Sequence, residues 1–571
     1  MLRSLWRFLR HEWTLASLGG LLLAAVMFWP AVIHPTTTIT ADIWDPTLQA
    51  WQMAWSGHIL KTDPSQLWNS NSFYPDQLTF AYSDTLLGYF PAGMIGNGPV
   101  AAIVRYNVMF VLIMALAFVG TYALVRQLGA GKLGAAVAGV AFAYSPWRWS
   151  QAGHMHVMSV GGILLALAML ARGHGFSLRD GWRPERARPG WVFAGWLVAA
   201  WQISISFGIG IPFAYVLGIV GLVAIVTWLR RRPRLGRRVV LFDVLGVVIF
   251  GAVAAFMARP YFEVLHQHPE AARSVDLLGL YSPSLRSFLT APAQSWVWGD
   301  AHAAARASMI APAETTLLAG FALYGLAFAG LFFSTWRRRT RIWLGIGVLV
   351  TAWLAWGTHA PFGRHVGYVL LYEYAPGWNA IRTPGRMFIW TTLLLAILAA
   401  GAVSALAQRA QELADETTAG RPRLAVRLAL LIPLVLVTVE GINSLDHPDV
   451  PRQPAAMRTV DGPLLVLPSD QNTDEIVMLW STTRFQKIVN GGSGFYPTGQ
   501  TALRDKAVNF PDQDSVLALR AAGIKTVLVL RNPPPTLIAD QYAKAENPDA
   551  PIDGLGIDRT VTDDAIIYTL N

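Results

Sequence analysis

Long apolar stretches alternate with short polar loops over the first 445 residues of the chain. A helix needs roughly 17–25 apolar residues to cross a bilayer, and most of these stretches have about that length. A backbone inside lipid must satisfy its own hydrogen bonds, so we expect helices rather than barrel strands of about ten alternating residues. The eleven predicted spans are 13–33, 100–125, 133–146, 157–171, 190–206, 209–229, 239–258, 314–335, 342–357, 386–408 and 425–445.

The pattern changes near the C-terminus. Short apolar runs bounded by turn residues alternate there with a helical pattern, which is typical of a small α/β domain. The predicted elements are strands at 464–467, 526–530 and 565–568 and a helix at 514–522. The sequence therefore predicts a mainly α protein, with a polytopic helical bundle at 1–447 and a separate α/β domain at 448–571.

Composition supports a membrane protein. Of the 571 residues, 53% are hydrophobic and only 14% are charged, whereas about a quarter of the residues of a soluble protein are charged. The chain has no cysteine, which excludes disulfides and thiolate metal sites.

The net charge of +10 is distributed as a topology signal rather than as a nucleic-acid surface. Short loops on one side of the spans carry 24 of the 45 Lys and Arg residues, including 230–232 and 337–339, and the longer opposite loops carry ten. Short basic loops face the cytoplasm. We therefore expect a cytoplasmic N-terminus, with Arg3, Arg7 and Arg10 before a retained first helix, and an extracytoplasmic C-terminal domain.

The first long outer loop, 34–99, begins with two acids, Asp42 and Asp45. Pro46 follows Asp45, which is typical of a helix start with Asp as its N-cap. The next residues place Trp51 and Trp55 on one face, which predicts an amphipathic helix at the membrane interface. Asp45 is then either a simple helix cap or a chemically active carboxylate.

The same loop contains further acids among aromatic residues. Tyr74 and Asp76 lie in the segment 73–76, and Asp84 follows Tyr82 closely. Several carboxylates and aromatic rings in one loop suit a pocket that binds sugars and positions a general base.

Two further outer loops contain polar residues with alternative interpretations. His154 and His156 in the second outer loop are suited to hydrogen-bonding a substrate or to capping the next helix, and their spacing is a weak metal signal. Arg382 and Arg386 lie on the side opposite the basic loops, which suggests that they bind a phosphate in a bidentate manner. Anchoring to ordinary anionic lipid is the alternative.

Three more residues of the outer loops bear on a phosphate site. Arg273 and Arg286 are secondary candidates for binding it. Glu314 fits a favourable acid in the first turn of a helix.

The C-terminal domain contains a glycine-rich segment, 489–497. It lacks the Lys-Ser/Thr of a P-loop and the strand–helix setting of a dinucleotide site. We interpret it as a tight structural turn.

These motifs, in this order, resemble those of the GT-C superfamily of polytopic glycosyltransferases. The Asp-x-x-Asp-Pro of 42–46 is similar to the acidic first loop of oligosaccharyltransferase catalytic subunits. The chain as a whole resembles a group of large bacterial membrane proteins of this superfamily. The shared motifs are Trp-x-x-x-Trp at 51–55, Phe-Tyr-Pro at 73–75, Gly-His at 153–154, Arg-x-Pro-x-Arg at 382–386 and Asn-Gly-x-Ser-Gly-Phe at 490–495.

The resemblance implies an inverting transferase of a bacterial inner membrane. Its donor would be a polyprenyl-phosphate-linked sugar and its acceptor a cell-envelope glycan or lipid. Asp45 would be the base, with Asp42 beside it, and Asp84 would bind sugar hydroxyls or a divalent cation. Arg382 and Arg386 would hold the leaving phosphate. The second outer loop has no Asp-x-Asp, so we expect a metal-independent reaction without a cofactor.

Two other functions are compatible with the sequence. A transporter or flippase of lipid-linked glycans usually has charges and broken helices near the bilayer midplane, often in repeated halves. The spans contain few charges and show no duplication, and Asp243 and Glu440 lie near helix ends. A non-catalytic envelope assembly protein would keep most of the same motifs.

Overall fold

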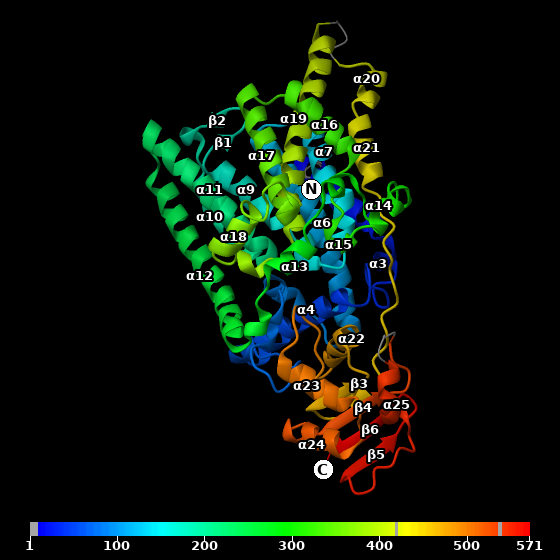
Figure 1. Cartoon of the computed structure of the whole chain (residues 1–571). Coiled ribbons are helices and arrows are strands. Elements are labelled where there is room, and N and C mark those ends of the chain that lie inside the picture. Colours follow the sequence, from blue (N-terminus) through cyan, green and yellow to red (C-terminus); the bar gives the residue numbers. More distant parts are fainter. Residues whose placement is uncertain (1–8, 417–420, 535–538, 571) are drawn as a thin grey trace, which may run out of the picture. The chain divides into compact units, whose positions relative to one another are not determined.

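The structure, a computed structural model, describes residues 9–416, 421–534 and 539–570 and is mainly helical (Figure 1). Arg3 and Arg7, which support the predicted orientation, lie outside the described residues. Within the described ranges, six helical stretches are long and apolar enough to cross a membrane. They are α6 (Gly98–Leu128), Met155–Gly173 with α8 (Met155–Met158) and α9 (Gly161–Gly173), α11 (Phe207–Arg231), α12 (Arg237–Gln267), Arg338–His359 with α17 (Arg338–Trp356), and Pro384–Asp415 with α19 (Phe388–Asp415).

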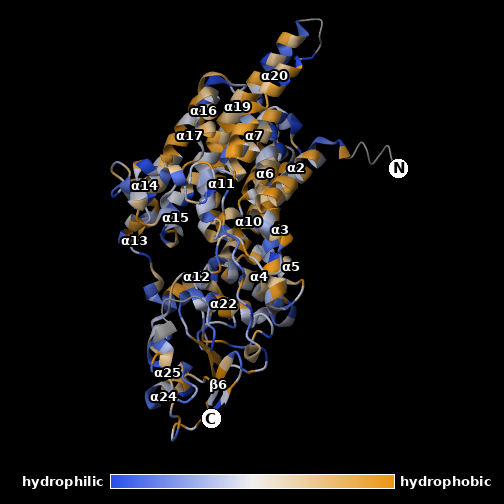
Figure 2. Cartoon of the chain, turned by 90° about the vertical axis from the view of Figure 1, so that its right-hand side faces the viewer, coloured by the Kyte–Doolittle hydropathy of each residue, from blue (hydrophilic) through white to orange (hydrophobic). Residues whose placement is uncertain are grey.

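Shorter apolar helices accompany these six, and the chain is a multi-pass membrane protein. They are α2 (Glu12–Met27), α7 (Lys132–Ala143) and α16 (Phe321–Phe332). Figure 2 shows that hydrophobic residues predominate in α7, α16, α17 and α19. The total of eleven spans and their orientation stay predictions.

Three of the predicted spans are interrupted in the structure. The predicted helix at 314–335 is wrong at its start, because α15 (Pro312–Thr315) and α16 are separated by Gly320, whose φ is +112°. The N–H of Leu317 donates to the Ser287 carbonyl at 2.9 Å, which takes this backbone out of the helix. The predicted span 13–33 is divided into α2 and α3 (Trp29–Ile33). The predicted span 425–445 is divided into α20 (Leu424–Ala429) and α21 (Ile432–Glu440).

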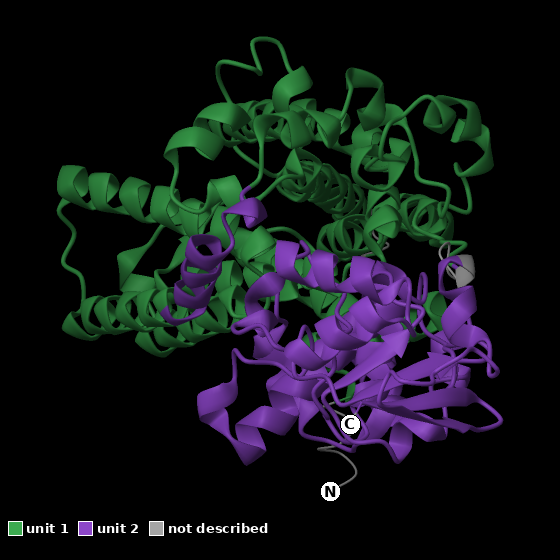
Figure 3. Ribbon diagram, turned by 60° about the horizontal axis from the view of Figure 1, so that its bottom comes forward, with its two compact units in different colours: residues 1–29, 110–255, 273–445 green, residues 30–109, 256–272, 446–571 purple. Residues whose placement is uncertain are grey.

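The described chain forms two compact units (Figure 3). Unit 1 contains 1–29, 110–255 and 273–445, and unit 2 contains 30–109, 256–272 and 446–571. The first outer loop therefore packs with the C-terminal segment, which is a grouping that the predicted boundary at 447/448 did not include.

In unit 1, α19 is the central helix. It packs against α7, α16 and α17, and most of its first 17 residues are buried. A Cβ on Gly134 of α7 would lie 2.5 Å from the Ala400 carbonyl oxygen, and one on Gly330 of α16 would lie 2.2 Å from that of Leu398. The two glycines therefore allow α7 and α16 to pack closely against α19. The packing of α19 fixes the position of the loop that ends at its first residue, Phe388.

Unit 2 contains a four-stranded sheet in the order β3-β4-β6-β5. The β3–β4 pair is parallel and the other two pairs are antiparallel. The elements are β3 (Leu464–Leu467), β4 (Thr526–Leu530), β5 (Ile557–Val561), β6 (Ala565–Leu570), α22 (Gln471–Ser481), α23 (Thr498–Ala507) and α24 (Gln513–Ala521). The predicted α/β character and the elements β3, α24, β4 and β6 are confirmed.

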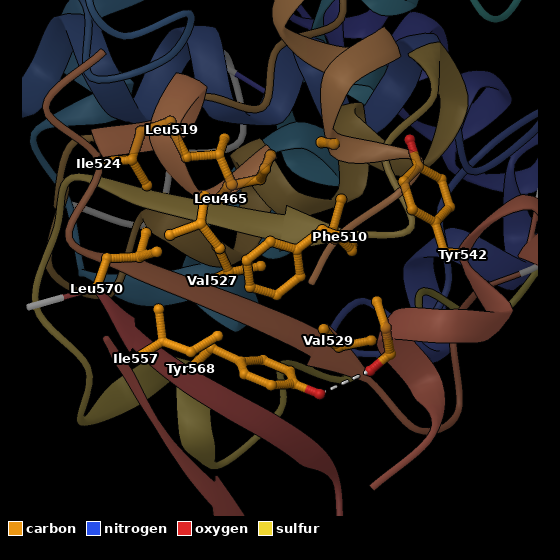
Figure 4. Close-up of a cluster of buried hydrophobic side chains, with 14 of the residues drawn as sticks. Leu465, Phe510, Leu519, Ile524, Val527, Val529, Tyr542, Ile557, Tyr568 and Leu570 are labelled. Atoms are coloured by element: carbon orange, nitrogen blue, oxygen red, sulfur yellow. Dashed lines mark hydrogen bonds between the residues drawn. The ribbon is translucent and has the colours of Figure 1, made fainter. Parts of the chain in front are cut away.

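The core of this sheet consists of alternate strand residues and helix residues (Figure 4). Val527, Phe510 and Tyr568 are all fully buried in it. The Tyr568 hydroxyl donates to the Ala545 carbonyl at 3.2 Å, which satisfies the one polar atom of that ring.

The first outer loop adds backbone pairing to this domain. The Tyr74 N–H donates to the Ile488 carbonyl at 3.0 Å, and the Ile488 N–H donates to the Asn71 carbonyl at 2.8 Å. Ile488 itself bridges to Leu464 of β3. The segments 71–74 and 488–490 thus extend the sheet beyond β3.

The helix predicted to lie on the membrane interface is buried in unit 2. It is α4 (Asp45–Thr62), which packs against α22 and α5 (Phe90–Gly93). Because thirteen of its residues are buried, on all sides of the helix, the predicted amphipathic pattern with an exposed polar face is wrong, and its position at the membrane interface stays a prediction. Its tryptophans contact partners inside the unit, which the spacing of apolar positions alone could not indicate.

A close backbone approach holds α4 against α5. A Cβ on Gly57 would lie 2.0 Å from the Gly93 carbonyl carbon. We expect Gly57→Ala to destabilise unit 2 by about 1–3 kcal/mol, because the extra methyl forces the two backbones apart. The measurement is thermal unfolding of purified protein, followed by tryptophan fluorescence.

The matched control is Gly499→Ala in α23, where an added Cβ would meet no atom within 4 Å. This variant should be neutral or slightly more stable, since alanine favours the helix. Equal stability of the Gly57 variant and the wild type would contradict the close packing of α4 and α5.

Candidate active-site residues in two units

Two carboxylates stand at the start of α4 in unit 2. The Trp44 N–H donates to Asp42 Oδ1 at 2.9 Å, which turns the chain into the helix. Asp45 is the first helical residue, and Trp44 occupies the N-cap position. The predicted N-cap position of Asp45 is therefore wrong by one residue, since Trp44 takes it. Its carboxylate lies in the first turn, where the helix dipole favours negative charge.

A third carboxyl group joins them from the C-terminal domain. Glu475 lies on α22, which packs against α4, and it is 2% exposed. Burial raises the pKa of Glu475 well above its usual range, and the charges of Asp45 and Asp42 raise it further. We call Asp42, Asp45 and Glu475 the carboxyl cluster. Both effects favour the neutral form of Glu475 over its carboxylate.

The glycine-rich segment covers Glu475. A Cβ on Gly492 would lie 2.3 Å from Glu475 Cγ, so no larger residue fits there. A buried ion pair holds this segment, since Asp474 accepts from Arg504 and from the Gly491 N–H at 3.1 Å. The Asn490 amide also donates to Asp474, at 2.6 Å. Within 489–497 the backbone bends at 489 and at 493–494 without a hydrogen-bonded turn, so the predicted tight turn is not found, and Gly492 packs against Glu475 of the carboxyl cluster.

The remaining predicted residues of unit 2 differ in exposure. Asp84 is half-buried, and Gln52 donates to its carbonyl oxygen at 2.7 Å. Tyr74 is half-buried beneath Lys487, whose Nζ lies 5.4 Å from the ring centroid. Trp51 is 2% exposed and donates to Asn71 Oδ1 at 3.1 Å, so it packs the interior of the unit.

Sequence reasoning missed a second polar group in unit 2. Tyr82 Oη lies 3.2 Å from His268 Nε2, and His268 Nδ1 lies 3.4 Å from Glu270 Oε1. Burial raises the pKa of nearby Asp76, although Gln500 and His268 act in the opposite direction. The segments concerned are far apart in the sequence, and no local motif marks His268 or Glu270.

In unit 1, Arg386 forms a bidentate ion pair with Glu314. The two nitrogen–oxygen distances are 2.5 and 3.2 Å, and the side chains are 14% and 10% exposed. Burial alone would raise the pKa of Glu314, but Arg386 and His154 outweigh it and hold that pKa below its usual range. Much of the positive charge of Arg386 is therefore balanced inside the protein.

His154 lies close enough to this pair in unit 1 to act on the charge of Glu314. His154 holds the N-cap position of α8 without a side-chain cap bond. The rings of His154 and His156 are 5.6 Å apart between centroids. The described residues include no group of three His, Cys, Asp or Glu side chains suited to a metal ion.

Arg382 and Arg273 form a separate pair of like charges in unit 1. Burial lowers the pKa of Arg273, and the nearby charge of Arg382 lowers it further. The Arg382 guanidinium lies over the Tyr281 ring, 5.2 Å from its centroid. The Tyr372 hydroxyl donates to the Arg273 carbonyl at 2.7 Å, which holds the backbone of this loop. The structure thus brings Arg382 together with Arg273, whereas the sequence suggested pairing it with Arg386.

Comparison with solved structures identifies the fold. The mycobacterial arabinofuranosyltransferase AftD aligns with 98% of this chain at 16% identity and a TM-score of 0.52, and the chain spans 40% of that protein's length. The oligosaccharyltransferase of Archaeoglobus fulgidus aligns with 90% of the chain and 69% of its own length, at 13% identity and a TM-score of 0.47.

A third alignment, with ArnT from Cupriavidus metallidurans bound to undecaprenyl phosphate, covers 97% of this chain and 98% of that one, at 15% identity and a TM-score of 0.35. No family model matches the chain, and no curated protein sequence matches it. The fold assignment rests on the first alignment. The chain has the fold of that arabinofuranosyltransferase, which is the GT-C fold that the resemblance led us to expect.

The neighbouring acids of α22 allow a direct test of the carboxyl cluster. We expect Asp474→Asn to cost about 3–5 kcal/mol, because it leaves Arg504 buried without its partner. We expect Glu475→Gln to preserve stability, because glutamine resembles the neutral acid. The measurement is thermal unfolding of both variants between pH 5 and pH 8.

The pH dependence has a defined sign. A carboxyl group whose pKa is raised on folding stabilises the fold below its unfolded pKa, and that contribution is lost as the pH rises through the folded pKa. The Glu475→Gln variant should therefore gain stability relative to wild type as the pH rises. Destabilisation equal to that of Asp474→Asn would show that Glu475 is ionised and paired.

The ion pair of unit 1 gives a third prediction. We expect Arg386→Gln to cost about 3–5 kcal/mol, because Glu314 is left as an unpaired buried charge. Adding Glu314→Gln should restore much of that loss, with a coupling energy of about 1–3 kcal/mol in a double-mutant cycle of thermal unfolding. Strictly additive effects would show that the two residues do not depend on each other.

Proposed function

We propose that the protein is a membrane glycosyltransferase that moves a sugar from a polyprenyl-phosphate donor to a glycan or lipid acceptor of the cell envelope, on the outer face of a bacterial inner membrane. The observation that carries the proposal is the carboxyl cluster at the start of α4, in a chain with the GT-C fold. Three carboxyl groups gathered in a half-buried region are costly for stability, and such clusters are typical of sites for proton transfer.

Asp45 is the general base in this proposal. It removes the proton of the acceptor hydroxyl while the hydroxyl oxygen attacks the anomeric carbon of the donor. The bond between that carbon and the phosphate oxygen breaks, the phosphate leaves with the electron pair, and the anomeric configuration inverts. Asp42 keeps the local field negative, and Asp84 binds sugar hydroxyls.

Arg382 and Arg273 stabilise the departing phosphate. Fixed positive charges are most effective where negative charge develops in the transition state. Two guanidinium groups held near each other in unit 1 meet that need better than Arg386, whose charge is balanced by Glu314. In this proposal Arg386, His154 and His156 hold the surrounding structure in place and do not bind the phosphate.

The reaction in this proposal uses no cofactor and no metal ion. The support comes from the sequence, because the second outer loop has no Asp-x-Asp motif. Transfer is therefore expected to persist in the presence of EDTA. Loss of turnover with EDTA and recovery with a divalent cation would instead assign a cation to Asp84.

The test is a transfer assay read by mass spectrometry. Full-length protein in lipid is offered a panel of polyprenyl-phosphate sugars and a cell-envelope glycan extract. Asp45→Asn should lower turnover by at least about 100-fold, and Arg382→Gln by about 10–1,000-fold through the loss of phosphate stabilisation. The control is Asp63→Asn, an exposed acid just after α4, which should keep full activity.

Each alternative predicts a different result. Turnover that survives in Asp45→Asn would move the base to Asp42 or Asp84. Absence of turnover with every donor, in protein shown to be folded, would contradict the proposal and favour a flippase or an assembly protein.

A further inference from the structure

Unit 1 contains a cavity of about 660 Å³ that the proposed function does not use. It lies between α13 (Val275–Leu280), the segment 308–315 and the segment 358–365. Binding cavities for small molecules range from about 300 to 1,000 Å³. The described lining residues do not include Arg382, Arg386 or Arg273. They do include Leu280 and Ser282, which flank Tyr281, over which Arg382 lies, so the cavity borders the arginine pair of unit 1.

Hydroxyl groups line the inner part of the cavity. Ser282, Ser287, Thr315 and Thr358 are each less than 9% exposed. Their positions are held by hydrogen bonds, since Ser282 Oγ donates to the Leu278 carbonyl at 2.8 Å and accepts from the Thr358 N–H at 3.0 Å. Ser282 Oγ also accepts from the Thr358 hydroxyl at 3.1 Å, so its hydrogen-bonding capacity is used within the protein. The Thr358 and Thr315 hydroxyls donate to Ser282 and to the Ala311 carbonyl, and each can still accept a hydrogen bond from a sugar hydroxyl.

Cationic groups line the outer part. Arg286 and Arg364 are exposed, and so are His359 and His365. Arg286 donates to the Ser308 carbonyl at 3.1 Å, which orients its guanidinium, and the guanidinium has further N–H groups to offer. Asp276 is the one carboxylate among the described lining residues, so the lining carries a positive charge.

We propose that this cavity binds a sugar phosphate, with the phosphate at Arg286 and Arg364 and the sugar against the serine and threonine hydroxyls. Arginine recognises phosphate through paired N–H groups. No Phe, Tyr or Trp occurs among the described lining residues, and the two histidines carry the only rings there. The ligand is either a soluble sugar phosphate or the sugar-phosphate head of a lipid-linked donor. With a soluble sugar phosphate as ligand the site goes beyond the proposed function, whereas with the lipid-linked head it rests on the proposed function and holds its donor.

The test is calorimetric titration of the full-length protein in lipid nanodiscs with glucose 1-phosphate, glucose and inorganic phosphate. Glucose 1-phosphate should bind at least about tenfold more tightly than either part alone, a difference of about 1.4 kcal/mol. The double variant Arg286→Gln/Arg364→Gln should weaken its binding by at least about tenfold. Ser308→Trp places a bulky ring on the lining and should remove binding without changing the charge.

The matched control is Arg338→Gln/Arg339→Gln, which removes two exposed arginines at the start of α17, outside the cavity lining. It should leave the affinity unchanged. Absence of binding, equal affinity for phosphate alone, or unchanged affinity in the Arg286/Arg364 and Ser308 variants would each overturn the proposal.

A second arm distinguishes the two sources of the ligand. Nanodiscs that contain polyprenyl phosphoglucose should weaken the binding of glucose 1-phosphate if the lipid-linked head occupies the cavity. Unchanged binding identifies a soluble sugar phosphate as the ligand. Because the readout is binding, the result is independent of whether the chain transfers sugar.

Discussion

Unit 2 depends on the backbone pairing between the first outer loop and the C-terminal domain. Residues 71–74 bond to 488–490, and residues 37–41 bond to 446–450. Buried N–H and C=O groups need partners, and here each segment supplies the partners of the other. The pairing places α4 against α22, and α22 brings Glu475 to Asp42 and Asp45.

Charge balance separates the arginines of unit 1 into two classes. Arg386 is fixed by Glu314 in a geometry that satisfies both side chains, so it contributes mainly structure. Arg382 and Arg273 have been brought together against their mutual repulsion, which only the surrounding fold can sustain. The sequence motif Arg-x-Pro-x-Arg does not distinguish its two arginines. In the fold, Arg386 is paired with a carboxylate and Arg382 lies near another arginine.

Much of the fold was predictable, because it rests on local patterns. Long apolar stretches indicated the helices of the bundle, and short apolar runs indicated β3, β4 and β6. β5 was missed because only its first residue, Ile557, is buried. α22 was also missed. Asp470 was the signal that could have found it, because its side chain caps the helix by accepting from the N–H groups of Asn472 and Thr473. The site was predictable only in part, because the packing of α22 on α4 brings Glu475 within the electrostatic influence of Asp45, which lies 430 positions earlier in the chain.

The pairing of 71–74 with 488–490 also sets an order of events during synthesis. The first outer loop leaves the ribosome long before residues 488–490 are made, so its acids and its backbone groups must wait for about 400 further residues. Such long-range pairing is slow, and the waiting segments are exposed to wrong partners. The helices of unit 1 can insert one after another, but the carboxyl cluster can assemble only after α22 and the segment 488–490 have been synthesised. A chain that stops before α22 leaves α4 without its partner helix.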